Sequence, residues 1–260
     1  MSDFDDLLRE AQQRPLTGWD LSCDGRIVTT PAPWQFEAEV DRLARRSPDL
    51  LDMGTGGGEW LSQLPHRPAR TVATEGWAPN VGIARERLAP LGIEVVEVEG
   101  ADDNALQADD GSAQPRLPFG DASFHLVVNR HESFAAREVQ RILMPGGHFL
   151  TQQVASDFNA GFHALLGLPW TEPPRWQLDT ATAQLARAGL RVLQGEEGAE
   201  RLRFADVGAF AWYLLQVPYV CPDFRIDTCR AALARLHARI AQGEPLEVRQ
   251  ALFRLVAMRP

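Results

Sequence analysis

The feature that most constrains the fold of this chain is a glycine-rich run between an apolar segment and a helical pattern. The run reads Asp52-Met53-Gly54-Thr55-Gly56-Gly57-Gly58-Glu59. Residues 49–53 have the apolar character of a short buried strand, and residues 59–64 begin a helix. Glycine lets the backbone turn sharply and approach a ligand closely. The run therefore predicts a ligand-binding loop at the carboxyl edge of a parallel sheet.

Strand and helix patterns alternate after this loop. We expect further strands at 71–75, 93–99, 125–129, 148–154, 190–194 and 251–258. We expect helices at 4–13, 36–46, 79–88, 134–143, 180–188, 206–215 and 227–241, with Asp179 capping the fifth and Pro145-Gly146-Gly147 ending the fourth. This alternation predicts an α/β fold with a mainly parallel sheet covered on both faces.

Composition narrows the class of protein. The 260 residues carry a formal net charge of −9, which argues against non-specific binding to DNA. All basic residues are arginine, so neither a Schiff-base lysine nor a phosphate-loop lysine is available. No segment is apolar enough to span a bilayer, and the acidic N-terminus does not resemble a signal peptide. We therefore expect a cytoplasmic protein. We expect no metal site, because Cys23, Cys221 and Cys229 form no CxxC pair.

The spacing of the glycines separates two classes of ligand. A dinucleotide-binding loop follows the pattern G-x-G-x-x-G/A. Gly54 and Gly56 fit that pattern, but Glu59 stands at its third position. A glutamate there would place a carboxylate near a pyrophosphate. The loop therefore favours a ligand without phosphate.

Several ordered segments of the chain together resemble the class I methyltransferases that depend on S-adenosylmethionine (SAM). They are 50–58, the acidic Glu75 that ends the second strand, the run 117–128 beginning Leu-Pro-Phe-Gly-Asp, and the run 138–150 with Pro-Gly-Gly. The resemblance implies a seven-stranded doubly wound sheet of order 3-2-1-4-5-7-6 with the last strand antiparallel. The predicted helices add an N-terminal helical segment and a helical insertion before the last strand, and the resemblance implies S-adenosylhomocysteine as product.

The resemblance assigns residues to the cofactor. The methionine portion of SAM would lie along the loop residues Asp52, Gly54, Thr55, Gly56 and Gly58. Glu75 would accept hydrogen bonds from the ribose hydroxyls, with Gly76 beside it. Trp77 would either lie against the adenine or be an ordinary core or surface tryptophan. The third strand leads into Ala101-Asp102-Asp103, where one of the two aspartates would meet the adenine amino group; an insertion leaves the choice between them open.

Residues 129–132 leave the fourth strand where the methyl group would meet its acceptor. Asn129 is expected to contact the cofactor. His131 is a candidate proton acceptor, and Glu132 could act likewise or orient it. A structural role is equally compatible with these residues, because methyl transfer can proceed by alignment alone.

The expected divisions are an N-terminal helical lid (1–46), the SAM-binding core (47–201), a helical cap (202–245) and a last strand that returns to the sheet (246–260). Aromatic residues gather after the fifth strand and suggest either a lid over a substrate pocket or core packing: Trp170, Trp176, Phe204, Phe210, Trp212, Tyr213 and Tyr219. Trp19 and Trp34 invite the same two interpretations.

Three functions follow from these patterns. The first is methyl transfer to a small molecule, which the acidic charge favours. The second is methylation of an RNA base, which only the arginine-rich C-terminal third supports. The third is a non-catalytic SAM-binding module. Neither DNA nor a membrane is an expected partner, and the oligomeric state is open.

Overall fold

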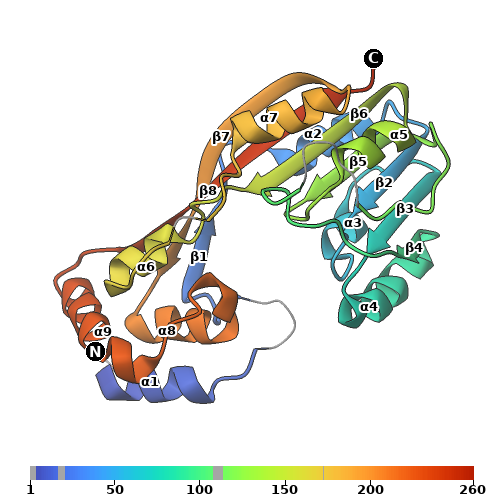
Figure 1. Ribbon diagram of the computed structural model, residues 1–260. Helices are drawn as coiled ribbons and strands as arrows, with labels where there is room; N and C mark the ends of the chain where they lie inside the picture. Colours follow the sequence, from blue (N-terminus) through green and yellow to red (C-terminus); the bar gives the residue numbers. More distant parts are fainter. Residues whose placement is uncertain (1–3, 17–20, 108–113, 172) are drawn as a thin grey trace. The chain divides into compact units, whose positions relative to one another are not determined.

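The computed structural model describes residues 4–16, 21–107, 114–171 and 173–260 (Figure 1). The expectation for Trp19 lies outside these residues. The chain divides into two compact units that each combine separate stretches of sequence. Unit 1 comprises 1–33, 156–173 and 198–251, and unit 2 comprises 34–155, 174–197 and 252–260. These units do not follow the four consecutive divisions expected from the sequence, because each unit is built from segments that meet only in space.

The helices of the described residues are α1 (Phe4–Gln13), α2 (Phe36–Ala44), α3 (Glu59–Gln63), α4 (Ala78–Leu88), α5 (Ala136–Ile142), α6 (Ala160–Leu166), α7 (Leu178–Arg187), α8 (Val207–Gln216) and α9 (Ile226–Ala241), with short 3-10 turns η1 (Ala89–Leu91) and η2 (Pro218–Val220). The strands are β1 (Ile27–Thr30), β2 (Asp49–Met53), β3 (Arg70–Glu75), β4 (Glu94–Glu97), β5 (Phe124–Arg130), β6 (Leu143–Val154), β7 (Arg191–Phe204) and β8 (Leu246–Met258). None of these helices is long and apolar enough to cross a membrane.

Unit 2 is built on a sheet in which β2 lies between β3 and β5. The pairs β2–β3, β2–β5, β3–β4 and β5–β6 are parallel, and β8 pairs antiparallel with β6. The strand order across this sheet is β4-β3-β2-β5-β6-β8-β7. All five residues of β2 are buried, as expected for a central parallel strand covered on both faces. The carboxyl ends of β2, β3 and β5 therefore meet at one edge.

Three local expectations are corrected. The sheet has eight strands rather than seven, because β1 pairs antiparallel with residues 201–204 of β7, within unit 1. Pro145-Gly146-Gly147 does not simply end a helix: it lies inside β6, which starts at Leu143. Asp179 lies in the first turn of α7, whose N-cap is Gln177. Short strands and cap positions depend on partners elsewhere in the chain, so local pattern misplaces them.

Unit 1 has its own hydrophobic core, which lies between its helices and the parts of β7 and β8 that belong to this unit. Helices α1 and α8 pack together, as do α6 and α9 (Figure 1). Phe162 stacks on Tyr213 with ring centroids 5.5 Å apart, and Phe204 meets the same ring edge-on. Phe210 and Trp212 are also buried in this core. Much of the expected aromatic lid is thus core packing, while Tyr219 is 68% exposed.

Candidate active site

The glycine loop joins β2 to α3 at the carboxyl edge of the sheet in unit 2. Gly54, Gly56 and Gly58 all adopt positive φ, a conformation that side chains with a Cβ rarely adopt. The loop is held to β3 through Thr74. The Thr55 amide donates to the Thr74 carbonyl at 2.9 Å, and the Gly54 amide reaches the Thr74 hydroxyl at 3.4 Å. The neighbouring strand therefore sets the position of the loop.

Gly54 is needed for a second reason, which is the side chain of Glu132. A Cβ on Gly54 would lie 2.5 Å from the Cγ of Glu132 and 2.7 Å from its Cβ. By contrast, a Cβ on Gly56 would meet nothing within 4 Å. Glu132 follows β5 in the chain, so the loops after β2 and β5 are in close contact here.

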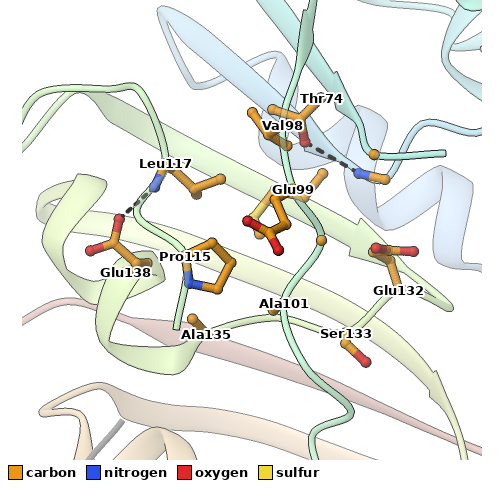
Figure 2. A pocket seen from close by; sticks show the side chains of 14 residues that line it. Thr74, Val98, Glu99, Ala101, Pro115, Leu117, Glu132, Ser133, Ala135 and Glu138 are labelled. Carbon is orange, nitrogen blue, oxygen red and sulfur yellow. Dashed lines mark hydrogen bonds between the residues drawn. The ribbon is translucent and has the colours of Figure 1, made fainter. Parts of the chain in front are cut away.

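A pocket opens beside this contact, between the ends of β2, β3 and β5 and the segment after β4 (Figure 2). It is lined by Met53, Gly54, Thr74, Gly76, Val98, Glu99, Gly100, Ala101, Pro115, Leu117, Glu132, Ser133, Ala135 and Glu138. Three of these side chains are glutamates, and none of the described lining residues is basic. The pocket is therefore acidic and suits a ligand with positive charge.

The three glutamates of the pocket have different surroundings. Glu138 accepts a hydrogen bond from the Leu117 amide at 2.9 Å (Figure 2) and pairs with Arg141 at 2.7 Å. Glu132 lies beside Gly100, and burial, with a smaller contribution from the charge of Glu75, raises the pKa of its carboxyl. Glu138 thus anchors the Leu117 segment, whereas Glu132 faces the pocket with a carboxylate that a cation would stabilise.

Asp52 is the penultimate residue of β2 and Glu75 the last residue of the adjacent β3, and both are buried. Burial raises the pKa of Asp52 to about 7. The Glu75 carboxylate accepts hydrogen bonds from the amides of Gly76 at 3.0 Å and Trp77 at 2.8 Å, which holds the turn after β3. Glu75 is not among the lining residues of the pocket, although its neighbour Gly76 is. Trp77 is 55% exposed, so it is not a core residue and lies at the surface.

The end of the loop is fixed by an ion pair. Arg87 of α4 donates to the carboxylate of Glu59 and to the Gly57 carbonyl. The carboxylate that set this loop apart from a dinucleotide loop is therefore engaged by an arginine of the same unit. The hydroxyl of Thr55 is buried next to the carboxyl of Asp52, and its hydrogen bond to that carboxyl partly offsets the rise in the Asp52 pKa caused by burial.

The acidic turn after β4 is engaged in local bonds. The Asp102 carboxylate accepts from the amide of Gln114 at 3.0 Å, and Asp103 accepts from the Ala105 amide at 2.9 Å. Neither aspartate lines the pocket, whereas Ala101 does. The acidic side chain that lines it from this segment is Glu99 (Figure 2).

Asn129 has its polar atoms turned into the sheet. Its carbonyl oxygen accepts from Thr151 at 2.9 Å and from Gln153 at 2.6 Å, and its amide nitrogen lies 3.5 Å from the Met53 carbonyl. The side chain is fully buried and does not line the pocket. Its observed bonds hold neighbouring strands together.

His131 is one of the few non-glycine residues with positive φ, 58°. Its Nε2 lies 2.9 Å from the amide nitrogen of Gln152, which can only donate. The neutral ring then accepts at Nε2 and carries its proton on Nδ1. His131 is exposed at the residue level, but desolvation of its ring, with the charge of Arg130, lowers its pKa below the usual range. The ring is therefore neutral at pH 7, with one nitrogen already bonded.

Sequence reasoning did not assign several residues that line the pocket: Thr74, Val98, Glu99, Gly100, Pro115, Leu117, Ser133 and Glu138. The Leu117 segment was visible as a motif, but its approach to the segment after β4 was not. The sequence alone could have indicated Glu99 as a site residue, because it is the first acidic residue after β4.

Comparison with known proteins agrees with this geometry. A model of the methyltransferase-domain family matches residues 51–151, which contain the glycine loop, Glu75 and β5. A search among curated proteins finds no match. A Deinococcus radiodurans protein of unknown function superposes with a TM-score of 0.57 at 19% identity, covering 99% of each chain. A candidate methyltransferase of Bacillus halodurans superposes with a TM-score of 0.54 at 16% identity, covering 86% of this chain and 98% of its own. Residues 51–151 thus match the methyltransferase-domain family model, and the two superposed proteins share the fold of this chain.

Proposed function

We propose that this protein transfers the methyl group of SAM to a small-molecule acceptor. The observation that carries the proposal is the acidic pocket beside the glycine loop, which is lined by Glu99, Glu132 and the Arg141-paired Glu138 and by no basic residue among its described lining. SAM brings an ammonium and a sulfonium and has no phosphate, so it fits these charges. A dinucleotide would bring its pyrophosphate into the same acidic surroundings and be repelled.

We assign the cofactor to residues around this pocket. The loop Asp52–Gly58 would lie along the methionine portion of SAM. Glu75 would accept from the ribose hydroxyls, because a carboxylate has lone pairs beyond those that hold the Gly76 turn. Glu99 and Ala101 would border the adenine. Asp102 and Asp103 are poorer candidates, since their carboxylates already accept hydrogen bonds.

SAM supplies an electrophilic methyl group when bound, and the role of the protein is to align it with the acceptor. We place Glu132 with the cofactor rather than with the acceptor, because its side chain lies over Gly54. His131 as proton acceptor remains a prediction. In that role its Nε2 would first have to release Gln152. Alignment without a protein base is therefore our preferred mechanism.

A small acceptor is favoured over RNA by the partners of the C-terminal arginines. Residues 175–260 contain 12 arginines. Five of these pair with carboxylates within their own unit, namely Arg175, Arg203, Arg230, Arg239 and Arg254. Paired arginines are poor phosphate ligands, because binding RNA would break an existing ion pair. The number of arginines in this stretch thus overstates its attraction for a phosphate backbone.

Titration calorimetry with SAM and with NAD tests the cofactor. We expect SAM to bind and NAD not to bind. Glu75→Gln should weaken SAM binding by about 1–3 kcal/mol, roughly 5- to 150-fold, because hydrogen bonds to the ribose are lost. Glu97→Gln is the matched control, since that exposed glutamate ends the next strand and pairs with Arg85. Equal affinities for the two variants would show that the ribose lies elsewhere.

The acceptor class is tested separately with SAM that carries a labelled methyl group. Cell extract is separated into small-molecule, RNA and protein fractions, and each is incubated with the protein and the labelled SAM. Label in the small-molecule fraction supports the proposal. Label confined to RNA would establish the alternative, and SAM binding without transfer to any fraction would indicate a non-catalytic binding module.

A further inference from the structure

The histidine that follows β5 is held by the neighbouring strand β6 through both its backbone and its ring (Figure 1). His131 directly precedes Glu132, which lines the acidic pocket. It has a φ of 58°, which is unfavourable for a residue with a Cβ. Its amide donates to the Gln152 carbonyl at 2.8 Å, and its Nε2 lies 2.9 Å from the side-chain nitrogen of Gln152. Strained residues of this kind gather at functional sites, so the strain points to a role for His131.

The orientation of the Gln152 amide is set by Trp34. The indole nitrogen of Trp34 donates to the Gln152 Oε1 at 2.6 Å, and both side chains are buried. An indole N–H can only donate, so the oxygen of the amide faces Trp34 and its nitrogen faces His131. That nitrogen in turn can only donate, so the Nε2 of His131 accepts. Three residues of unit 2 that are distant in sequence thus form one directed chain of hydrogen bonds, which ends at the imidazole ring.

This chain of hydrogen bonds fixes which ring nitrogen of His131 carries the proton. Because Nε2 accepts, the proton of the neutral ring is on Nδ1, which makes Nδ1 a donor. Protonation of Nε2 would set two donors against each other. Relief would require the Gln152 amide to turn, and its nitrogen would then face the Trp34 indole. Desolvation of the ring, which lowers its pKa, also favours the neutral form. His131 is therefore built to donate at Nδ1 rather than to accept a proton at Nε2.

We propose that His131 binds the methyl acceptor by donating its Nδ1 hydrogen to an oxygen of that molecule, and that Trp34 and Gln152 are positioning residues that keep it a donor. His131 lies at the carboxyl edge of the parallel strands, where ligands of such sheets bind. The acceptor is then a small molecule with a carbonyl, carboxylate or phenolate oxygen. This inference rests on the proposed methyl transfer, and it adds the group that the acceptor presents to the protein.

Two substitutions of His131 form a matched pair that separates a donor from a proton acceptor. Asparagine and aspartate both tolerate positive φ and are nearly equal in size. The asparagine amide can donate from close to the place of Nδ1, whereas an ionised aspartate can only accept. The measurement is the initial rate of label transfer from labelled SAM to the small-molecule fraction of cell extract. We expect His131→Asn to keep the rate within about threefold and His131→Asp to lower it at least about tenfold.

The positioning roles are tested on the full chain without any acceptor. Nitrogen-15 NMR of the imidazole rings shows which nitrogen carries the proton, and His131→Asn identifies the signals of His131. We expect the proton on Nδ1 in the unaltered protein. Trp34→Phe removes the indole donor and lets the Gln152 amide turn, so the ratio of the two tautomers should shift toward Nε2 by at least about fivefold. Trp60→Phe is the matched control, because the indole nitrogen of Trp60 has no hydrogen-bond partner among the described residues.

Several results would overturn the proposal. Equal rates for His131→Asn and His131→Asp exclude donation, and a faster His131→Asp shows that the residue accepts a proton. A proton on Nε2 in the unaltered protein, or a tautomer ratio that Trp34→Phe leaves unchanged, excludes the positioning roles. The tautomer of the unaltered protein remains decisive even if a variant fails to fold. If the unaltered protein labels no small molecule, the function proposed above fails and the acceptor contact of His131 fails with it. The NMR result then decides by itself on Trp34 and Gln152.

Discussion

Replacement of Gly54 by alanine tests whether the loop after β2 and the loop after β5 are packed as tightly as the structure shows. The new methyl group would lie 2.5 Å from the Cγ of Glu132 and would also sit on a backbone at φ +70°. Gly56→Ala is the matched control, because Gly56 has φ +63° but open space around its Cβ position. The two changes share the conformational strain and differ in the steric contact.

The expected losses in the free energy of unfolding follow from the backbone strain and the steric contact. A side chain at positive φ costs about 1–2 kcal/mol, so Gly56→Ala should lower the free energy of unfolding by about that amount. Gly54→Ala should add an overpacking cost of about 1–3 kcal/mol, for a total of about 2–5 kcal/mol. Glu132→Gly removes both the Cβ and the Cγ that would collide. In that background, Gly54→Ala should cost only what Gly56→Ala costs, which gives a coupling free energy of about 1–3 kcal/mol.

The assay is equilibrium unfolding in urea followed by far-ultraviolet circular dichroism, with free energies from the midpoints and slopes. Equal losses for Gly54→Ala and Gly56→Ala would falsify the steric argument. The same conclusion follows if Glu132→Gly leaves the cost of Gly54→Ala unchanged. SAM affinity provides a second measurement, since a displaced loop should also bind the cofactor more weakly.

Two further predictions concern the pH dependence of stability. The pKa of Asp52 is raised to about 7 in the folded protein, so folding favours its protonated form, and stability falls as the pH rises from about 4 to about 7. Asp52→Asn should therefore raise the free energy of unfolding at pH 8 by at most about 4 kcal/mol and have little effect near pH 4, and urea midpoints at the two values check this. In unit 1, burial favours the neutral form of Asp206, but Arg26 at 2.6 and 2.9 Å and the Ala209 amide together hold its pKa below the usual range. Its contribution is thus present at neutral pH and lost as the pH falls, so Asp206→Asn should cost about 1–3 kcal/mol at pH 7 and almost nothing near pH 2, and a midpoint that does not change at pH 7 would refute it.

The local sequence was sufficient to predict the central elements of unit 2. The apolar run of β2 and the glycines after it predicted the strand, the turn and the following helix, because strand burial and positive φ are properties of short segments. Glu75 was placed correctly at the end of β3 for the same reason. The long helices α1 and α9 were also predicted closely from their periodicity.

The local sequence could not predict which residues form hydrogen bonds or ion pairs with a given side chain. The Glu59 carboxylate was judged by its place in the loop, but Arg87 of α4 pairs with it. Asn129 was expected at the cofactor, but Thr151 and Gln153 of the next strand engage its amide. In each case a polar group is satisfied by a residue that only folding brings near it, and this partner decides which atoms remain for a ligand.

The sequence by itself determined that the chain has a strand, a glycine turn and a helix suited to a ligand without phosphate, because turn geometry and hydrophobic periodicity are local. Only the tertiary structure decided that Glu99 and Glu132 line one acidic pocket, because they follow strands separated by β2 and β3. It also decided that β1 and residues 198–251 belong to one unit. Charge and shape at a site depend on which distant segments pack together, and that choice is made by burial of the whole chain rather than by any one segment.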